Sequence, residues 1–330
     1  MNMSLAHQQV LITGATGFLG GAMALALAEA GARVRALARS PHKAERLRQR
    51  GIEVVQGDIT DFGSLQRAAA GCERVFHVAV SYGSMAQQRA ANVEGTRLVA
   101  RAAADAGAER ILHISSIAVY GNNVRGLVSE AAPPAPGAFA YAISKSEGEG
   151  ALIDACCTGD LAFTILRPGM IYGPGSQPWT AQMVKLARLR PTPWLGDGSG
   201  TAHPIYVDDV VALALRAADH DAARGQIFNV TPDPAPTWRT FLGAYQQILG
   251  HDRWLGAPPA LMRGLTQLIR PLTPIHSVLR DAPAMIDFAT HQTTFSMQKA
   301  RDLLGWQPAT DLETGILNCI PWLREQGLLR

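Results

Sequence analysis

The stretch VLITGATGFLGG, residues 10–21, decides the fold of this 330-residue chain. The apolar run at residues 10–13 predicts a short buried strand, and the apolar residues 18–30 predict a long helix that Gly31 ends. A glycine-rich turn therefore joins a strand to a helix.

The glycines of this turn predict a phosphate site. Gly14 can make a tight turn, Gly17 can bring the backbone close to an anion, and Gly20 can let the helix pack closely. The N-terminus of the helix adds free N–H groups and a positive dipole. The G-x-x-G-x-x-G spacing is one residue wider at its first gap than the common dinucleotide fingerprint, so a turn that binds nothing is the alternative.

Strand-like and helical segments alternate from residue 8 to about residue 167. The expected strands are VLIT, RVRAL, IEVVQ, RVFHV, RILHIS and LAFTIL. Repeated β-α units predict an α/β fold with a Rossmann-type, doubly wound parallel sheet. We therefore expect a dinucleotide-binding domain at 1–167, to which 202–231 returns, and a smaller interleaved C-terminal substrate-binding lobe formed mainly by 168–201 and 232–330.

The bulk composition is that of an ordinary soluble enzyme. A formal charge of +3 with dispersed arginines does not suggest nucleic acid as a partner. The four cysteines lack metal-ligand spacing, which predicts neither zinc nor a disulfide framework. With neither a signal peptide nor a transmembrane segment in the sequence, a cytoplasmic protein is expected. The apolar segment 260–279, interrupted by arginines and prolines, is interpreted as amphipathic, covering a pocket or lying on a membrane surface.

The residue after the second expected strand bears on the cofactor. An NAD site usually has an acidic residue here for the ribose 2′-hydroxyl, but this chain has Arg39. A guanidinium suits a 2′-phosphate, with Lys43 or Arg46 as further contacts, so we expect NADP(H) in preference to NAD(H). Solvated charges at the start of a helix are the alternative. After the third strand, Asp58 is placed to meet the adenine amine or simply to form a turn.

Tyr141 and Lys145 are four residues apart on an expected helix and hence on one face. A phenol is a poor acid-base group at neutral pH, but a nearby ammonium favours its ionised form. Tyr141 could then exchange a proton with a carbonyl or alcohol oxygen as hydride moves. Ser116, at the end of the strand RILHIS, could orient the same oxygen. Its alternative role is to cap a strand or helix end.

These residues and motifs resemble the extended short-chain dehydrogenases/reductases, nearest to the 3β-hydroxysteroid dehydrogenase and dihydroflavonol reductase-like branch. The resemblance covers nearly the whole chain. It is carried by TGATGFLG, GDITD, VFHVAV, NVEGT, ISSIAVYG, YAISK, LRPGMIYGPG, IYVDDV and KARDLLGWQP. It implies that Ser116, Tyr141 and Lys145 form a catalytic triad, which Asn92 supports.

The resemblance also implies a set of cofactor contacts. The glycine loop, with Thr16, Phe18 and Leu19, would hold the pyrophosphate, and Asp58 and Ile59 would contact the adenine. Ala79 would lie beside the phosphates. Residues Pro168, Gly169 and Met170 would flank the nicotinamide, near Tyr141 and Lys145. A homodimer through helices within 84–106 and 140–156 is common in the family and is expected here.

Departures from two branches of the family indicate the substrate class. The acidic pair that sugar-nucleotide dehydratases carry after the catalytic hydroxyl is replaced by Ile117 and Ala118, and Ala202-His203 stand where epimerases often have an arginine. We therefore expect NADP(H)-dependent interconversion of a relatively apolar ketone and a secondary alcohol, with Trp179, His203 and Tyr206 as candidate substrate contacts. The alternatives are a sugar-nucleotide epimerase or dehydratase, and a non-catalytic cofactor sensor or scaffold.

Overall fold

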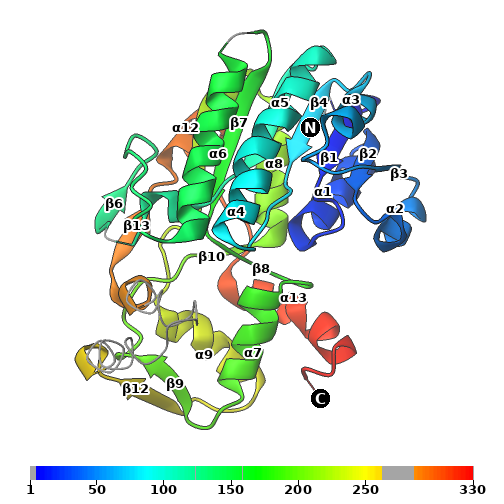
Figure 1. Ribbon diagram of the computed structural model, residues 1–330. Helices are drawn as coiled ribbons and strands as arrows, with labels where there is room; N and C mark the ends of the chain where they lie inside the picture. The colour runs from blue at the N-terminus through cyan, green and yellow to red at the C-terminus, as the bar shows by residue number, and fades with distance from the viewer. Residues whose placement is uncertain (1–4, 123, 158, 262–285, 330) are drawn as a thin grey trace.

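The computed structural model describes residues 5–122, 124–157, 159–261 and 286–329. A seven-stranded sheet runs through the larger part of it, in the order β11-β7-β5-β4-β1-β2-β3, with every neighbouring pair parallel (Figure 1). The strands are β1 (Gln9–Thr13), β2 (Arg33–Ala38), β3 (Glu53–Gln56), β4 (Arg74–His77), β5 (Arg110–Ile114), β7 (Ala162–Pro168) and β11 (Gln226–Val230). The expected doubly wound parallel sheet is confirmed.

Helices cover both faces of this sheet. The helical elements up to β11 are α1 (Phe18–Glu29), η1 (Pro41–Ala44), α2 (Glu45–Arg48), α3 (Phe62–Ala69), α4 (Met85–Gln88), the π-helical turn η2 (Arg89–Glu94), α5 (Gly95–Asp105), η3 (Ile117–Tyr120), α6 (Ala140–Cys156), η4 (Gln177–Ala181), α7 (Gln182–Ala187), α8 (Val207–Asp219) and η5 (Asp221–Ala223). One apolar core packs α1 and α8 on the sheet, and a second packs α3, α5 and α6 on the other face. Strands covered on both sides are apolar throughout, which explains their continuous hydrophobic runs.

Arg110, the first residue of β5, anchors α8 to the sheet. Its side chain is buried, and Nη1 donates to the carbonyl oxygens of Ala217 and His220, at 2.9 and 2.8 Å. These carbonyls lie at the C-terminal end of α8, where intrahelical partners run out and a cation is favoured. The contact orients the helix that leads into β11, the strand that joins the far edge of the sheet.

Most of the remaining elements form a smaller lobe at one end of the sheet (Figure 1). It contains the paired strands β8 (Met170–Tyr172) and β10 (Pro204–Tyr206), the paired strands β9 (Thr192–Leu195) and β12 (Trp254–Ala257), and the helices α7, α9 (Trp238–Ile248) and α13 (Leu312–Glu325). Strand β6 (Gly126–Val128) pairs with β13 (Thr293–Phe295), which precedes α12 (Gln298–Leu304). Segments before and after β11 in the chain thus build the lobe together.

Candidate active site

The glycine loop lies at the point where the strand order reverses. The chain runs outward from β1 to β2 and β3, and then returns to place β4 on the other side of β1. Ligands of doubly wound sheets bind beyond the carboxyl ends of the strands at this point. The loops that follow β1 and β4 therefore form the centre of the candidate site.

Two of the three glycines are required by close backbone contacts. A Cβ atom on Gly14, whose φ is +73°, would lie 2.6 Å from the amide nitrogen of Ala79. A Cβ atom on Gly20 would lie 2.2 Å from the carbonyl oxygen of Gly14. Gly14 thus brings the first loop against the chain after β4, and Gly20 brings α1 against that loop. The roles expected for these two glycines agree with their packing.

The N-terminus of α1 is open toward this loop. Gly17 is the N-cap residue and no side chain caps the helix. Among the described residues, the amide N–H groups of Phe18 and Leu19 make no hydrogen bond, and Thr16 and Gly17 are exposed. These free amides lie at the positive end of the helix, next to a loop whose close packing depends on the missing Cβ atoms of Gly14 and Gly20. Such an arrangement fits a pyrophosphate.

Basic side chains follow the carboxyl end of β2. Arg39, Lys43 and Arg46 are exposed, and within the described chain none of their side chains makes a hydrogen bond or an ion pair. They fit a 2′-phosphate, since an unpaired guanidinium can take a phosphate without breaking an existing pair. After β3, Asp58 accepts hydrogen bonds at Oδ1 from the amide and hydroxyl of Thr60, both at 2.9 Å. These bonds form a turn and do not use Oδ2.

Tyr141, Ser116 and Lys145 come together from α6 and from the end of β5. The Tyr141 phenol faces the side chain of Ser116, which caps η3 by accepting the amide of Ala118 at 3.1 Å. Burial raises the pKa of Tyr141 well above its ordinary value, Tyr82 adds to the rise, and the Ser116 side chain opposes it. This direction is opposite to the one expected from a neighbouring ammonium, because burial disfavours the charged phenolate.

The Lys145 ammonium is buried at the carboxyl end of β5. It donates to the carbonyl oxygen of Ile114 at 2.5 Å and lies 3.3 Å from Nε2 of His113. Burial lowers the pKa of Lys145 to about 8, and Glu149 acts in the opposite direction. Glu149 itself forms a buried, two-pronged ion pair with Arg167 of β7, at 2.9 and 2.6 Å, so the catalytic helix is tied to the sheet one turn beyond the lysine.

Asn92 connects the loop after β4 to the catalytic helix. Its Oδ1 accepts the amide of Ser81 at 2.7 Å, and its Nδ2 donates to the carbonyl of Ser81 and to Oγ of Ser144, both at 3.0 Å. A Cβ on Gly148 would lie 2.3 Å from the Asn92 carbonyl oxygen, so α6 packs directly on η2. This geometry suits the supporting role that the resemblance implies.

Two buried histidines belong to the same environment, and sequence reasoning missed the role of His113. The ring of His77 lies between Thr13 and Thr96, with nitrogen-to-oxygen distances of 2.8 and 3.0 Å. It stacks on His113 with ring centroids 5.0 Å apart. The sequence signal for His113 is a polar residue within an otherwise apolar strand segment that leads to Ser115 and Ser116. Both rings link the glycine loop to Lys145 through contacts that join β1, β4 and β5.

The segment expected beside the nicotinamide is bonded within the protein. The amide of Gly169 donates to the Val230 carbonyl at 3.0 Å, and the amide of Met170 donates to the His203 carbonyl at 2.7 Å. A Cβ on Gly169 would lie 2.3 Å from the same His203 oxygen. Pro168, at the end of β7, is buried. These two amides are therefore already paired within the protein.

The three candidate substrate contacts lie in packed surroundings. His203 is 3 % exposed with its ring edge-on to Phe295, and burial lowers its pKa to about 4. Tyr206 is 6 % exposed, and burial raises its pKa to about 12. Both side chains therefore contribute to packing in this arrangement. Trp179 is half-buried among other aromatic rings.

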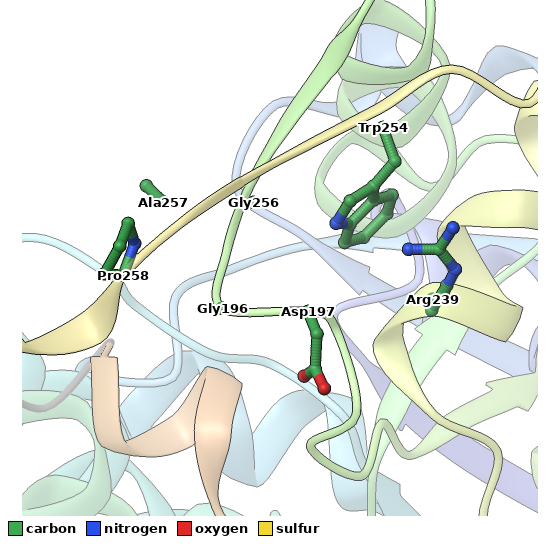
Figure 2. Close-up of a pocket in the computed structure, with 7 residues that line it drawn as sticks. All are labelled: Gly196, Asp197, Arg239, Trp254, Gly256, Ala257 and Pro258. Carbon is green, nitrogen blue, oxygen red and sulfur yellow. The ribbon is translucent and has the colours of Figure 1, made fainter.

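A separate pocket opens in the smaller lobe between β9, β12 and α9 (Figure 2). It has a volume of about 350 Å³, and the Arg239 guanidinium lies 5.2 Å from the centroid of the Trp254 ring at its wall. None of the triad residues lines it.

Most of the amphipathic segment 260–279 lies outside the described residues, and no described helix has the length and apolarity to span a membrane.

Comparisons with known proteins identify the family of this chain. A 31 % identical relative, the ceramide reductase of Caulobacter vibrioides, is matched over 97 % of this chain and 96 % of its own. The 3beta-hydroxysteroid-dehydrogenase/decarboxylase isoform 2 of Arabidopsis thaliana is 28 % identical over 84 % of this chain, which spans only 53 % of that relative's length.

A solved structure supports the fold. UDP-glucuronic acid 4-epimerase from Bacillus cereus, in complex with NAD, superposes with a TM-score of 0.76 at 21 % identity, over 98 % of this chain and 100 % of its own. Residues 10–231 match the model of the NAD dependent epimerase/dehydratase family. The chain is therefore an enzyme of the extended short-chain dehydrogenase/reductase type and belongs to the NAD dependent epimerase/dehydratase family.

Proposed function

We propose that this enzyme is an NADP(H)-dependent oxidoreductase that interconverts a relatively apolar ketone and the corresponding secondary alcohol. The observation that carries the proposal is the Tyr141 phenol, which faces Ser116 and lies one helical turn from Lys145. These groups follow β5 at the same sheet edge as the glycine loop. The residues after Ser116 are Ile117 and Ala118, which offer no acid or base for a dehydration.

Tyr141 is the proton donor in this mechanism. A bound nicotinamide cofactor would supply the hydride for the carbonyl carbon in reduction and would accept it in oxidation. Tyr141 donates its proton to the carbonyl oxygen, and Ser116 orients that oxygen by a hydrogen bond. The raised pKa of Tyr141 keeps it in the phenol form that reduction requires. Lys145 holds the cofactor ribose.

We assign the cofactor contacts as the sequence predicts. The glycine loop and the free amides of α1 hold the pyrophosphate, with Thr16 at the rim. Arg39 takes the 2′-phosphate. Asp58, Ile59, Ala79 and the segment 168–170 complete the cofactor site, and Trp179 is retained as a substrate contact because part of its ring is accessible.

Tyr141→Phe tests the mechanism. We expect kcat for NADPH-dependent ketone reduction to fall by at least about 100-fold, because the proton donor is lost, while the Kd for NADPH stays the same. Purified protein is mixed with NADPH and a panel of aromatic, steroidal and long-chain ketones, and absorbance at the nicotinamide band is followed. Tyr172→Phe is the matched control, since it removes a buried phenol hydroxyl outside the triad.

Three outcomes would contradict the proposal. Full turnover by Tyr141→Phe would remove Tyr141 from the chemistry. Tightly copurifying cofactor with no net NADPH consumption by the wild type would favour epimerisation, in which oxidation and reduction cancel within one site. Cofactor binding with no turnover on any substrate class would favour a sensor or scaffold.

A further inference from the structure

Two aromatic side chains outside the triad lie directly against Tyr141. The ring of Tyr82, in the loop between β4 and α4, stacks on the Tyr141 ring with centroids 5.1 Å apart and 26° between the planes. Phe139, the N-cap residue of α6, is tilted against the same ring at 6.0 Å. Tyr82 is 72 % exposed and Phe139 is 37 % exposed. The catalytic phenol thus has an aromatic wall that is open to solvent.

The backbone that carries Tyr82 is held firmly. On one side, the amide and carbonyl of Ser81 are both bonded to the Asn92 side chain. On the other side, Ser84 and Gln87 form a reciprocal capping box at the start of α4. Tyr82 is therefore placed by its neighbours on both sides, while its own side chain remains exposed. An exposed ring on a preorganised loop is suited to contact a ligand.

Tyr82 also acts on the acidity of the catalytic phenol. Burial is the largest cause of the raised pKa of Tyr141, and the adjacent Tyr82 phenol raises it further. In ketone reduction the acceptor of the Tyr141 proton is the substrate carbonyl. The stacked Tyr82 ring therefore lies beside the place that this carbonyl must reach.

The surroundings of this wall are uncharged. The loop that bears Tyr82 reads VAVSYGS at residues 78–84, and the segment that leads to Phe139 reads PPAPGAFA at residues 133–140. Val80, in the first of these, is 39 % exposed. Neither segment offers a cation for a phosphate or carboxylate, whereas flat apolar groups can stack on the rings.

We propose that Tyr82 is a specificity-determining residue: its ring contacts a flat, apolar group next to the substrate carbonyl that takes the Tyr141 proton. The enzyme therefore prefers aryl or ring-fused ketones over flexible aliphatic ones. This inference rests on the proposed ketone reduction and names its substrate class.

The ratio of two substrates tests the inference. The value of kcat/KM is measured with NADPH for 2-acetonaphthone and for 2-decanone in the wild type, Tyr82→Ala and Tyr82→Phe. Loss of the ring in Tyr82→Ala should lower the preference for the aryl ketone by about 3- to 10-fold, the size of an aromatic stacking contribution. Tyr82→Phe keeps the ring and should keep the preference. Leu127→Ala is the matched control, because Leu127 is 73 % exposed on β6.

The outcomes separate the two proposals. If the wild type reduces ketones and Tyr82→Ala changes both substrates equally, with an unchanged Kd for NADPH and an unchanged thermal unfolding midpoint, the specificity role of Tyr82 is overturned and ketone reduction stands. If the wild type reduces no ketone of the panel, the proposed function is overturned and the inference falls with it.

Discussion

Arg39 is the side chain on which we propose that the choice of cofactor depends. It follows the carboxyl end of β2, is exposed, and has no ionic partner among the described residues. A guanidinium binds a phosphate through two parallel hydrogen bonds, and an aspartate at the same place would repel it. The 2′-phosphate is the one feature that separates NADP(H) from NAD(H), so its recognition can depend on this single residue.

Arg39→Asp is therefore expected to raise the Kd for NADPH by about 10- to 100-fold and to leave the Kd for NADH nearly unchanged. Both constants can be measured by isothermal titration calorimetry. Arg33→Asp is the matched control, since Arg33 is also exposed but lies at the opposite end of the same strand. Equal effects on the two cofactors would remove Arg39 from the 2′-phosphate site.

Among the elements, α6 carries Tyr141 and Lys145 of the proposed triad and also the expected dimer contact. Its buried side includes Lys145, Gly148 and Glu149, which pack on η2 and on the sheet. Its other side exposes Gly150, where an added Cβ would meet nothing within 4 Å. We propose that this outer side pairs with α5 and α6 of a second copy in a four-helix arrangement.

Gly150→Arg tests that dimer. A long charged side chain at a close helix contact should shift the protein from dimer to monomer, measured as molar mass by light scattering after size exclusion. The helix itself should not weaken, because arginine has a better helix propensity than glycine by up to about 1 kcal/mol. Gly150→Ala should leave the mass unchanged. A monomeric wild type, or a dimeric arginine variant, would contradict the proposed interface.

Across the whole molecule, three buried histidines make stability depend on pH. Burial lowers the pKa of His77 to about 3 and of His203 to about 4, and it also lowers the pKa of His113. In the unfolded chain these histidines have pKa values near 6.5. At a pH between each native pKa and about 6.5, the unfolded chain therefore binds more protons than the native state. Stability should therefore be full above about pH 6.5 and fall as the pH decreases.

Each such histidine contributes a slope of about 1.4 kcal/mol of unfolding free energy per pH unit within its window. Urea unfolding of the wild type and of His203→Phe between pH 6.5 and 4.5 should show a smaller slope for the variant. His203 is chosen because its ring packs on Phe295 and an aromatic replacement keeps that contact. Identical slopes would show that His203 titrates alike in both states.

The order of strands and helices in the main sheet could be predicted from sequence because local periodicity reports which face of each element is buried. The alternation up to residue 167 and the returning strand at 226–230 follow this rule. The packing roles of Gly14 and Gly20 could also be predicted from the sequence, because glycine is the residue that tolerates a positive φ or a backbone contact too close for a Cβ.

What the sequence determined by itself is the set of chemical groups that follow each strand: the glycine loop, Arg39, Ser116, Tyr141 and Lys145. Only the tertiary structure decided how those groups are surrounded. Burial raised the pKa of Tyr141 where a neighbouring lysine suggested the reverse, and His203 and Tyr206 became packed side chains. The stacking of Tyr82 on Tyr141 joins residues 59 positions apart. Such contacts and desolvation depend on distant segments that local patterns do not encode, and the tertiary fold alone brings those segments together.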